Sequence, residues 1–405
     1  MSPPQSSDND EYQPHLVIST NDTGIWRLAY LPDGQRVATS SDGGTVKVWN
    51  LESGEQEGTS MEHKNNITGL AVTRDGSKII SSYHGGVIKV WNVESHQVIE
   101  EWTHPGSYPK IAISPDDRLI AVGTIWRVGI YTMEGRQVNE SIEVGEVVLS
   151  MCFSPDGKKL ACGTQDDILV YAVQSGTLIL RPLEVHQECV YDVLWSPDGS
   201  RLFSGSDDGK IRYWNSDTGE QIGHPWKGHT GWICSLSLSP DGSILATASS
   251  DYTVRFWDAT TGNPIGQHLQ HDEPVHAVRF SPCGEFVASA GRYEKIYLWR
   301  VPRLNPIKDS VTTPFMGVLA LVLTLLQASS ILSGIGDLFP GFDRLDASIF
   351  SIGSSVQLLT VLCSHLRQLV PLYLTPILPP CLRWNHSLIC PPLGMLLHYT
   401  TVRCI

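Results

Sequence analysis

Histidine, serine and aspartate recur together at one spacing in the middle of the chain. In two places a serine follows a histidine by 20 residues, and an aspartate follows the same histidine by 22. A histidine that links a hydroxyl group to a carboxylate has the composition of a charge relay for nucleophilic catalysis. The two sets are His186, Ser206 and Asp208, and His229, Ser249 and Asp251.

Other patterns that could carry chemistry are weaker. Residues 205–211 (GSDDGKI) resemble a phosphate loop, but they lie between two strand-like segments rather than before a helix. His271 and His276 are close in sequence, yet no third residue has the spacing of a metal ligand. Zinc-protease, nucleophile-elbow, Walker and dinucleotide-binding motifs do not occur. The sequence therefore predicts a protein that is not an enzyme, with no catalytic residue, cofactor or metal.

A turn tetrapeptide recurs seven times and divides the chain into similar units. Proline presets φ for a turn, aspartate bonds back to the backbone, and glycine accepts positive φ. The copies are 31–34 (LPDG), 73–76 (TRDG), 114–117 (SPDD), 154–157, 196–199 and 239–242 (all SPDG), and 281–284 (SPCG).

An aromatic residue recurs in step with this turn, at intervals of 40 to 43 residues. Segments with alternating apolar residues precede both markers, as in residues 45–49 (TVKVW) and 253–257 (TVRFW). Short strands separated by turns predict an all-β fold, and this period accommodates about four strands. The aromatic markers are Trp49, Trp91, Tyr131, Tyr171, Trp214, Trp257 and Trp299.

These repeats resemble the WD-repeat family, through Gly228-His229 and Trp257-Asp258 and over about residues 14–305. The resemblance implies a seven-bladed β-propeller of four-stranded antiparallel blades. The family tends to place a histidine eleven residues before the turn proline. Five of the seven copies have it: His63, His104, His186, His229 and His271.

The resemblance also implies that this histidine joins Ser, Asp and Trp in a hydrogen-bonded chain inside the blade. The serine is expected eight residues before the Trp and the aspartate six. Such a network is structural, and we favour it over a charge relay. Two copies carry all four residues: His186, Ser206, Asp208 and Trp214, and His229, Ser249, Asp251 and Trp257.

The two ends of the repeat region suggest how the ring closes. Pro302 and Pro306 disfavour a fourth strand after the last aromatic marker. Residues 14–20 (PHLVIST) have β character and come before the first strand of the first unit. We expect them to supply the missing outer strand, with residues 1–13 as a disordered leader.

Loops at one end of such a ring are the expected binding surface, because the scaffold holds them in fixed positions. Exposed aromatic and arginine side chains are common energetic anchors of interfaces. Trp232 is the first candidate, and the alternative is that it only caps a strand edge. The candidate rim residues are Trp26, His84, Tyr191, Asp207, Trp232, Ser250 and Arg292.

Composition narrows the classes of partner. The net charge of −13 disfavours a nucleic-acid platform, which needs basic surfaces. The nine cysteines show no paired spacing, which favours a reducing compartment and a cytoplasmic location. Protein or peptide partners and a monomeric propeller are expected.

Residues 306–405 have a different composition from the repeats. Only eight of the 97 residues from 309 to 405 are charged. Residues 316–335 contain no charge, and 20 helical residues span about 30 Å, the thickness of a bilayer core. A membrane anchor, an apolar helix packed on protein, and a poorly folding tail remain open for this segment.

The sequence thus supports three hypotheses for function. The first is a non-enzymatic scaffold with an adaptor, assembly or signalling role that binds partners on the propeller rim. The second is the same propeller displayed to the cytosol from a membrane anchor. The third, a remote one, is an enzyme with its site in the central channel.

Overall fold

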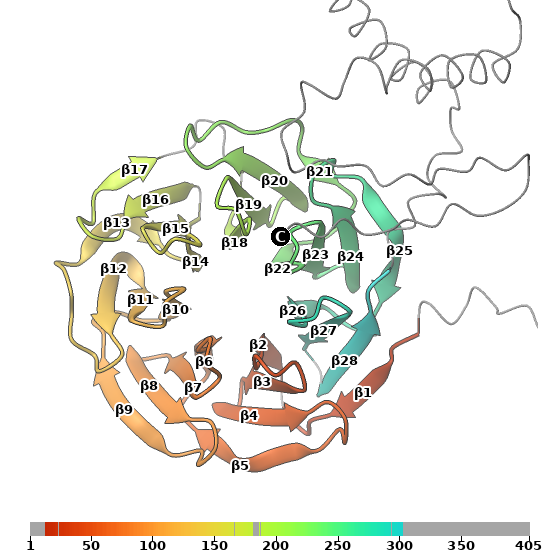
Figure 1. Ribbon diagram of the computed structural model, residues 1–405, viewed down its shortest axis with the longest axis horizontal. Helices are drawn as coiled ribbons and strands as arrows, with labels where there is room; N and C mark the ends of the chain where they lie inside the picture. The colour runs from red at the N-terminus through yellow and green to blue at the C-terminus, as the bar shows by residue number, and fades with distance from the viewer. Residues whose placement is uncertain are drawn as a thin grey trace, which may run out of the picture. The chain divides into compact units, whose positions relative to one another are not determined.

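The computed structural model describes residues 13–302, except residues 23, 166, 181–185, 187 and 293. Within this part of the chain, all the regular elements are strands, β1 to β28. They form seven four-stranded antiparallel sheets arranged as blades around an axis (Figure 1). The predicted all-β seven-bladed propeller is confirmed. The segments 1–12 and 303–405, including the possible membrane helix 316–335, lie outside the described residues.

Each of the first four blades follows the chain from the innermost strand to the outermost. Blade one is β2 (Ile25–Tyr30), β3 (Arg36–Ser41), β4 (Thr45–Asn50) and β5 (Gln56–Glu62). Blade two is β6 (Ile67–Val72), β7 (Lys78–Tyr83), β8 (Val87–Asn92) and β9 (Val98–Thr103). Blade three is β10 (Lys110–Ile113), β11 (Leu119–Gly123), β12 (Ile125–Thr132) and β13 (Ile142–Val147). Blade four is β14 (Ser150–Phe153), β15 (Lys159–Gly163), β16 (Ile168–Ala172) and β17 (Leu178–Leu180).

Blades five and six repeat this order, and blade seven takes its outer strand from the start of the chain. Blade five is β18 (Val190–Trp195), β19 (Arg201–Ser206), β20 (Lys210–Asn215) and β21 (Trp226–Lys227). Blade six is β22 (Ile233–Leu238), β23 (Ile244–Ser249), β24 (Thr253–Asp258) and β25 (Pro264–Gln270). Blade seven is β26 (Val275–Phe280), β27 (Phe286–Gly291), β28 (Lys295–Arg300) and β1 (Leu16–Ser19).

The recurring tetrapeptide makes the tight turn between the first two strands of a blade. In blade one the Asp33 carboxylate accepts hydrogen bonds from the backbone N–H groups of Gln35 (2.8 Å) and Arg36 (3.0 Å). Gly34 has φ of +71°, a value that a side chain would make costly. The Gly34 N–H donates to the Leu31 carbonyl at 3.0 Å and closes the turn. The turn residues therefore pin the register of each hairpin.

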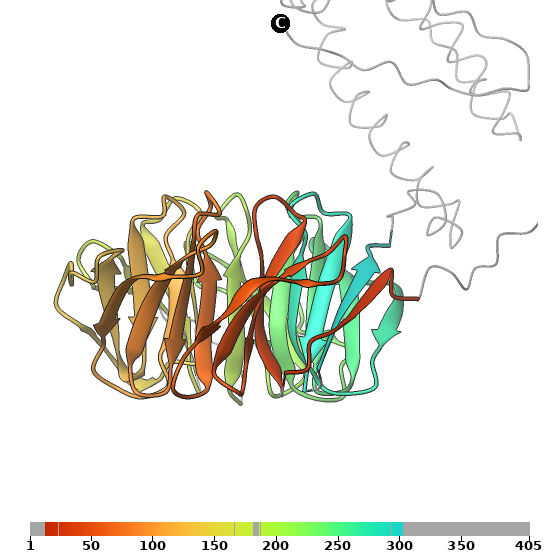
Figure 2. The ribbon, with the colours of Figure 1, turned by 90° about the horizontal axis from the view of Figure 1, so that it is seen from below.

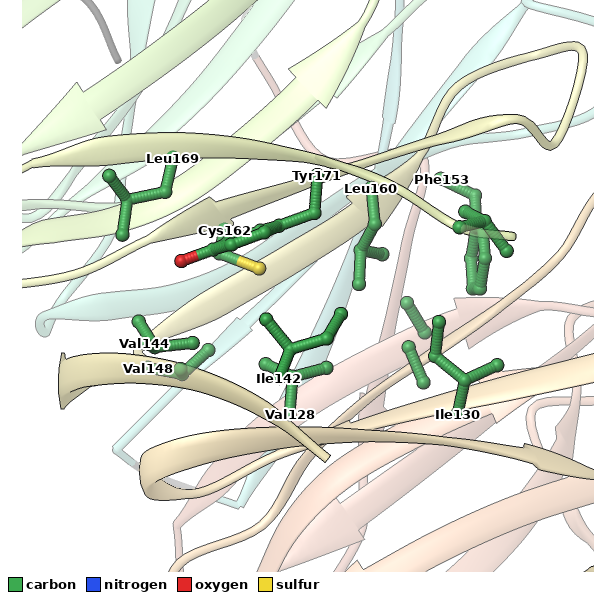
Figure 3. Packing of buried hydrophobic residues seen from close by; sticks show 13 residues of the cluster. Val128, Ile130, Ile142, Val144, Val148, Phe153, Leu160, Cys162, Leu169 and Tyr171 are labelled. Atoms are coloured by element: carbon green, nitrogen blue, oxygen red, sulfur yellow. The ribbon is translucent and has the colours of Figure 1, made fainter. Parts of the chain in front are cut away.

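The apolar core lies between neighbouring blades. Figure 3 shows the interface of blades three and four, where Val128 and Ile142 face Leu160 and Cys162. Each blade is covered by a neighbour on both faces, so its second strand is almost wholly buried, as in β3 and β19. The aromatic markers fill these interfaces: Trp257 of blade six, for example, packs among buried residues of blade five.

The ring closes through β1, as the sequence predicts. β1 pairs antiparallel with β28, with Leu16 opposite Leu298 and Ser19 opposite Lys295. Backbone hydrogen bonds from His15 N to Leu298 O (2.7 Å) and from Thr20 N to Glu294 O (2.6 Å) extend the pairing at both ends. The strands of every blade run between two faces of the ring, and loops connect them there (Figure 2).

Candidate functional site

The two predicted histidine sets are buried networks that tie the outer part of a blade to its centre. In blade six, Thr247 Oγ1 accepts a hydrogen bond from Trp257 Nε1 (2.9 Å) and lies 2.7 Å from His229 Nε2. On the other side of the imidazole ring, His229 Nδ1 lies 2.8 Å from Asp251 Oδ2. Blade five repeats this arrangement, with the hydroxyl group of Ser204 2.8 Å from His186 Nε2 and 3.0 Å from Trp214 Nε1.

The hydroxyl residue in these sets differs from the predicted one. Ser206 and Ser249 were expected to bond the histidine, but Ser204 and Thr247, two residues earlier, do so. In the strand pairing of each blade, the Trp lies opposite the residue twelve positions before it on the second strand. Its indole ring reaches diagonally to the residue two positions further along that strand, a distance of about 7 Å. Ser206 and Ser249 lie four residues along, about 13 Å, which is beyond that reach.

The two serines have another role, in the turn that follows. Ser206 Oγ accepts the backbone N–H of Asp208 (3.2 Å), and Ser249 Oγ accepts that of Asp251 (3.1 Å). These bonds hold the aspartates toward the histidines. The expected membership of His186, Asp208 and Trp214 in one network agrees with the observed contacts.

The Trp–hydroxyl pair extends beyond the two complete sets. It recurs as Thr39–Trp49 (2.9 Å), Ser81–Trp91 (2.7 Å) and Ser289–Trp299 (2.9 Å). Blades three and four have alanine at the hydroxyl position and tyrosine at the aromatic position. In blade three the Tyr131 hydroxyl group lies 2.6 Å from His104 Nδ1, so it takes the place of both partners. The sequence did carry a signal for this contact, because a serine or threonine stands ten residues before each Trp marker.

The electrostatics of these sets favour a fixed charge distribution. Burial opposes ionisation of Asp251, but hydrogen bonds from His229, Thr253 and the Thr230 N–H outweigh it and hold the pKa of Asp251 well below its usual range. Burial lowers the pKa of His229, although Asp251 partly offsets this effect. A neutral histidine thus faces an ionised aspartate.

The geometry of the sets does not suit a charge relay. Ser204 and Thr247 are 0% exposed, so a substrate cannot reach either hydroxyl group. Nucleophilic catalysis needs the attacking oxygen within reach of a substrate as well as of its base. The arrangement instead connects the strands of one blade.

The candidate rim residues lie on the face where the inner strands begin, at three kinds of position. Trp26 and Tyr191 are the second residues of β2 and β18, and Trp232 directly precedes β22. The turns between the second and third strands of their blades contain the other four, His84, Asp207, Ser250 and Arg292.

Trp26 of blade one is 40% exposed, and its ring stacks on His276 with centroids 4.2 Å apart and planes 14° apart. Trp26 Nε1 donates to Asp42 Oδ1 at 2.6 Å, and Asn66 donates to the same oxygen at 3.3 Å. The indole ring is therefore exposed but held in one orientation.

Trp232 caps the strand edge through its backbone and leaves its side chain exposed, while its role as a binding anchor stays a prediction. Its backbone caps the strand edge, because its N–H donates to Ser250 Oγ (2.8 Å) and its carbonyl accepts the Ser250 N–H (2.9 Å). Its side chain is 54% exposed and stacks with Tyr191, with centroids 6.2 Å apart. The backbone bonds therefore support an exposed aromatic pair.

Asp207 lies next to this pair, in the turn after β19. Its Oδ1 atom is buried and, within the described residues, has no hydrogen-bond partner. Burial and the neighbouring charges of Glu188 and Asp208 raise the pKa of Asp207. An acceptor of this kind suits a partner that brings a donor.

The other two rim candidates lie apart from these stacks. His84 contacts Tyr108 edge to face, with centroids 4.3 Å apart. Arg292 is exposed and lines a cavity of about 170 Å³ together with Glu273 and Lys295. The structure therefore brings Trp26 beside His276 and Tyr191 beside Trp232, while His84 and Arg292 lie in other loops.

Sequence reasoning missed three exposed aromatic residues. Trp126 and Tyr252 are 57% and 43% exposed, and Tyr108 is also exposed. Trp126 and Tyr252 both stand five residues before their blade's aromatic marker, and both have positive φ, +79° and +70°. Their shared position, five residues before the aromatic marker, could have identified both residues from the aligned repeats.

Two features are absent from the part of the chain that the structure describes. Among these residues, no three His, Cys, Asp or Glu side chains are grouped as metal ligands. No helix with the length and apolar character of a membrane span occurs among them either.

The fold and its repeated Trp–hydroxyl–His contacts define a WD-repeat propeller, and comparison with known families agrees. The family model of the WD domain, G-beta repeat, matches six segments that together cover more than half of the chain. The chain belongs to the WD-repeat family. The matched segments are 12–50, 54–92, 141–170, 177–215, 219–258 and 262–300. The interval between the second and third matched segments contains most of blade three. There Tyr131 replaces the usual Trp and Ala121 replaces the usual hydroxyl residue.

Several curated proteins are similar to this chain. It is 26% identical over 216 residues to telomerase protein component 1 of Mus musculus, covering 52% of this chain and 8% of that protein. It is 27% identical to periodic tryptophan protein 2 of Arabidopsis thaliana (47% and 22% covered). It is 30% identical to small ribosomal subunit protein RACK1y of Oryza sativa subsp. japonica (27% and 35% covered). The chain thus spans well under two thirds of each relative.

Proposed function

We propose that this propeller is a non-enzymatic scaffold that binds protein or peptide partners on the face carrying Trp26 and Trp232. The observation that carries the proposal is two aromatic stacks with exposed indole rings, Trp26–His276 and Tyr191–Trp232. A side-chain hydrogen bond holds the Trp26 indole, and backbone bonds hold Trp232 in place. Rigid aromatic side chains offer a large contact area and lose little conformational entropy on binding.

The chemistry of this face supports a protein ligand. Indole N–H and phenol groups combine apolar area with hydrogen bonding, and aromatic residues are enriched in the centres of protein interfaces. Asp207 adds a carboxylate oxygen, without a hydrogen-bond partner among the described residues, beside the Tyr191–Trp232 pair. Similar proteins are named as parts of larger assemblies, a ribosomal subunit and telomerase, which is consistent with an assembly role.

The free cysteines favour a reducing compartment for this work. Cys152, Cys162, Cys234 and Cys283 are free thiols. A cytoplasmic location follows as part of the proposal, since free thiols persist where disulfides do not form.

Affinity capture with the full chain and matched variants tests the proposal. We expect Trp26→Ala and Trp232→Ala to reduce recovery of specific partners, each weakening binding at least about thirtyfold, as for an interface hot spot. Ile99→Ala is the control, because Ile99 is exposed on the outer strand β9, away from this face.

The readout is quantitative mass spectrometry of captured proteins, with thermal unfolding to confirm that each variant is folded. Partners that bind both Trp variants normally but are lost with Ile99→Ala would place binding on the outer edge and overturn the proposal.

A further inference from the structure

The seven inner strands carry an unusual set of charges for an acidic protein. Together β2, β6, β10, β14, β18, β22 and β26 contain the basic residues Arg27, Lys110 and Arg279, and one acidic residue, Asp192. These strands surround the axis of the ring (Figure 1), and each contacts its two neighbours. The whole chain has a net charge of −13, so this excess of positive charge is local.

The repeat places three of these residues at one level along the axis. Arg27, Lys110 and Asp192 each stand five residues before the turn proline of their own blade. Gly69, Ser150, Ser235 and Ala277, with small side chains, occupy the equivalent place in the other four blades. Trp26 and Tyr191 are the residues just before Arg27 and Asp192, so this level adjoins the aromatic face.

Asp192 and Arg279 largely satisfy each other through β22. Asp192 Oδ2 accepts the Leu236 N–H at 2.8 Å and the Ser235 hydroxyl group at 3.3 Å. Arg279 Nη1 donates to Ser235 Oγ (2.7 Å) and lies 4.0 Å from Asp192 Oδ2. The one carboxylate of the inner strands is therefore already engaged.

Arg27 and Lys110 have no such partner. The Arg27 side chain donates to the Trp26 carbonyl at 3.3 Å. The Lys110 ammonium group has neither a hydrogen bond nor an ion pair with any described residue. Burial, together with the positive charge of Arg27, lowers the pKa of Lys110 to about 7. Asp192 is the counter-charge nearest to Arg27 on these strands, but Ser235, Leu236 and Arg279 already engage it. The remaining excess of positive charge suits an anionic ligand.

We propose that Arg27 and Lys110, with Arg279 below them, bind a phosphate-type oxyanion at the axis of the ring. Three basic residues against one carboxylate leave a net excess of two positive charges on the inner strands, which matches the charge of about −1.5 to −2 of a phosphate monoester better than one carboxylate. A guanidinium group with its planar donors and a mobile ammonium group are suited to phosphate oxygens.

The oxyanion has two possible sources, which share this chemistry. It is either a free polyphosphate or a phosphorylated side chain of a partner bound on the adjoining face. The second source rests on the proposed function, whereas the first does not. A test with both kinds of probe therefore separates failure of this site from failure of the partner-binding face.

Isothermal titration of the full chain with sodium pyrophosphate tests the site. We expect saturable binding that weakens at least about tenfold in Lys110→Met and in Arg27→Met, the loss typical of one charge-assisted hydrogen bond. Lys158→Met is the matched control: it removes the same charge from an exposed turn on the opposite face, and its affinity should stay within about twofold.

Thermal unfolding gives a second readout that does not depend on the titration. Removal of an unpartnered, partly buried cation should leave the melting temperature of Lys110→Met unchanged or higher. Pyrophosphate should raise the melting temperature of the wild type far more than that of this variant. Absence of pyrophosphate binding, or equal binding by the wild type and both Met variants, would overturn the proposal.

A phosphoserine peptide and its unphosphorylated form make the second arm. If the phosphopeptide binds more tightly than pyrophosphate, and Lys110→Met removes the difference between the two peptides, the source is a phosphorylated partner. If pyrophosphate binds and neither peptide does, the source is a free polyphosphate.

Discussion

At the residue scale, the stability of each blade depends on which hydroxyl group meets the histidine and the tryptophan. Thr247 accepts the Trp257 N–H and bonds His229, whereas Ser249 serves the turn before Asp251. All three polar partners of this set are buried. Loss of one therefore leaves others unsatisfied, which costs more than the bond itself.

We expect Thr247→Val to lower the free energy of unfolding by about 2–4 kcal/mol, because it leaves Trp257 Nε1 and His229 Nε2 without a partner at nearly constant volume. Urea denaturation measures the change. Thr230→Val, at an exposed threonine of the same blade, is the control and should stay within about 0.5 kcal/mol. Equal effects would mean that the buried network contributes little.

The buried histidines predict a marked loss of stability in acid. Burial lowers the pKa of His63 to about 3 and that of His104 and His271 to about 4. Their pKa in the unfolded chain is about 6.5, so the unfolded state binds more protons below that pH. The stability from the neutral rings is complete above about pH 6.5 and falls as the pH drops toward 4.

Each of these histidines should contribute about 1.4 kcal/mol per pH unit in that window. Urea denaturation at several pH values between 7.5 and 5 measures the slope. His271→Gln removes one of these histidines, so the slope should fall by about 1.4 kcal/mol per pH unit. The same substitution should lower the free energy of unfolding at neutral pH. A free energy of unfolding that does not change between pH 7 and 5 would contradict the assignment of neutral buried rings.

At the element scale, β1 is the strand that connects the start of the repeat region to its end. It completes blade seven through four register pairs with β28, and Ile18 packs in the cluster shared by blades seven and one. Without β1, the edge of β28 would be open and the apolar residues under it exposed. An unpaired edge strand also invites aggregation.

We expect deletion of residues 1–20 to lower the melting temperature by several degrees and to increase aggregation, because a strand's ladder of hydrogen bonds of about 1 kcal/mol each is lost. Deletion of residues 1–12 is the control, since it leaves β1 intact. Differential scanning calorimetry and light scattering give the two readouts. Identical melting temperatures for the two deletions would show that β1 does not hold the ring closed.

At the scale of the whole molecule, the apolar segment 316–335 follows the propeller in the sequence. The sequence-based hypothesis is that this uncharged segment anchors the full chain in a membrane, whereas residues 1–308 form a soluble monomer. Arg300, Arg303 and Lys308 precede the segment, an arrangement that the positive-inside rule associates with a cytosolic propeller.

We expect the full chain to stay in the membrane pellet after carbonate extraction and the 1–308 fragment to stay in solution. Leu323→Arg should release the full chain, because a charge near the middle of a span costs about 2.5–3.5 kcal/mol of insertion. Leu304→Arg, before the segment, is the matched control. Recovery of the wild type in the carbonate-soluble fraction would remove the membrane hypothesis.

The sequence by itself determined the fold class, the number of blades and the strand that closes the ring. Each depends on local rules: a turn that needs Pro, Asp and Gly, an alternating strand pattern, and a period of about 42 residues between markers. The resemblance to the WD-repeat family implied that His186, Asp208 and Trp214 share one network, and the repeat gave their register. Each of these features depends on residues that are close together within one repeat, so comparison of the seven repeats identified it.

The tertiary structure alone decided which side chains meet across strands and blades. The choice of Thr247 over Ser249 depends on the diagonal register of β23 and β24, which a count of residues along one strand cannot show. Arg27 and Lys110 are 83 residues apart and share one level of the ring only because the ring arranges their inner strands around one axis. Side-chain contacts of this kind depend on ring closure, which sets distances that local spacing leaves open.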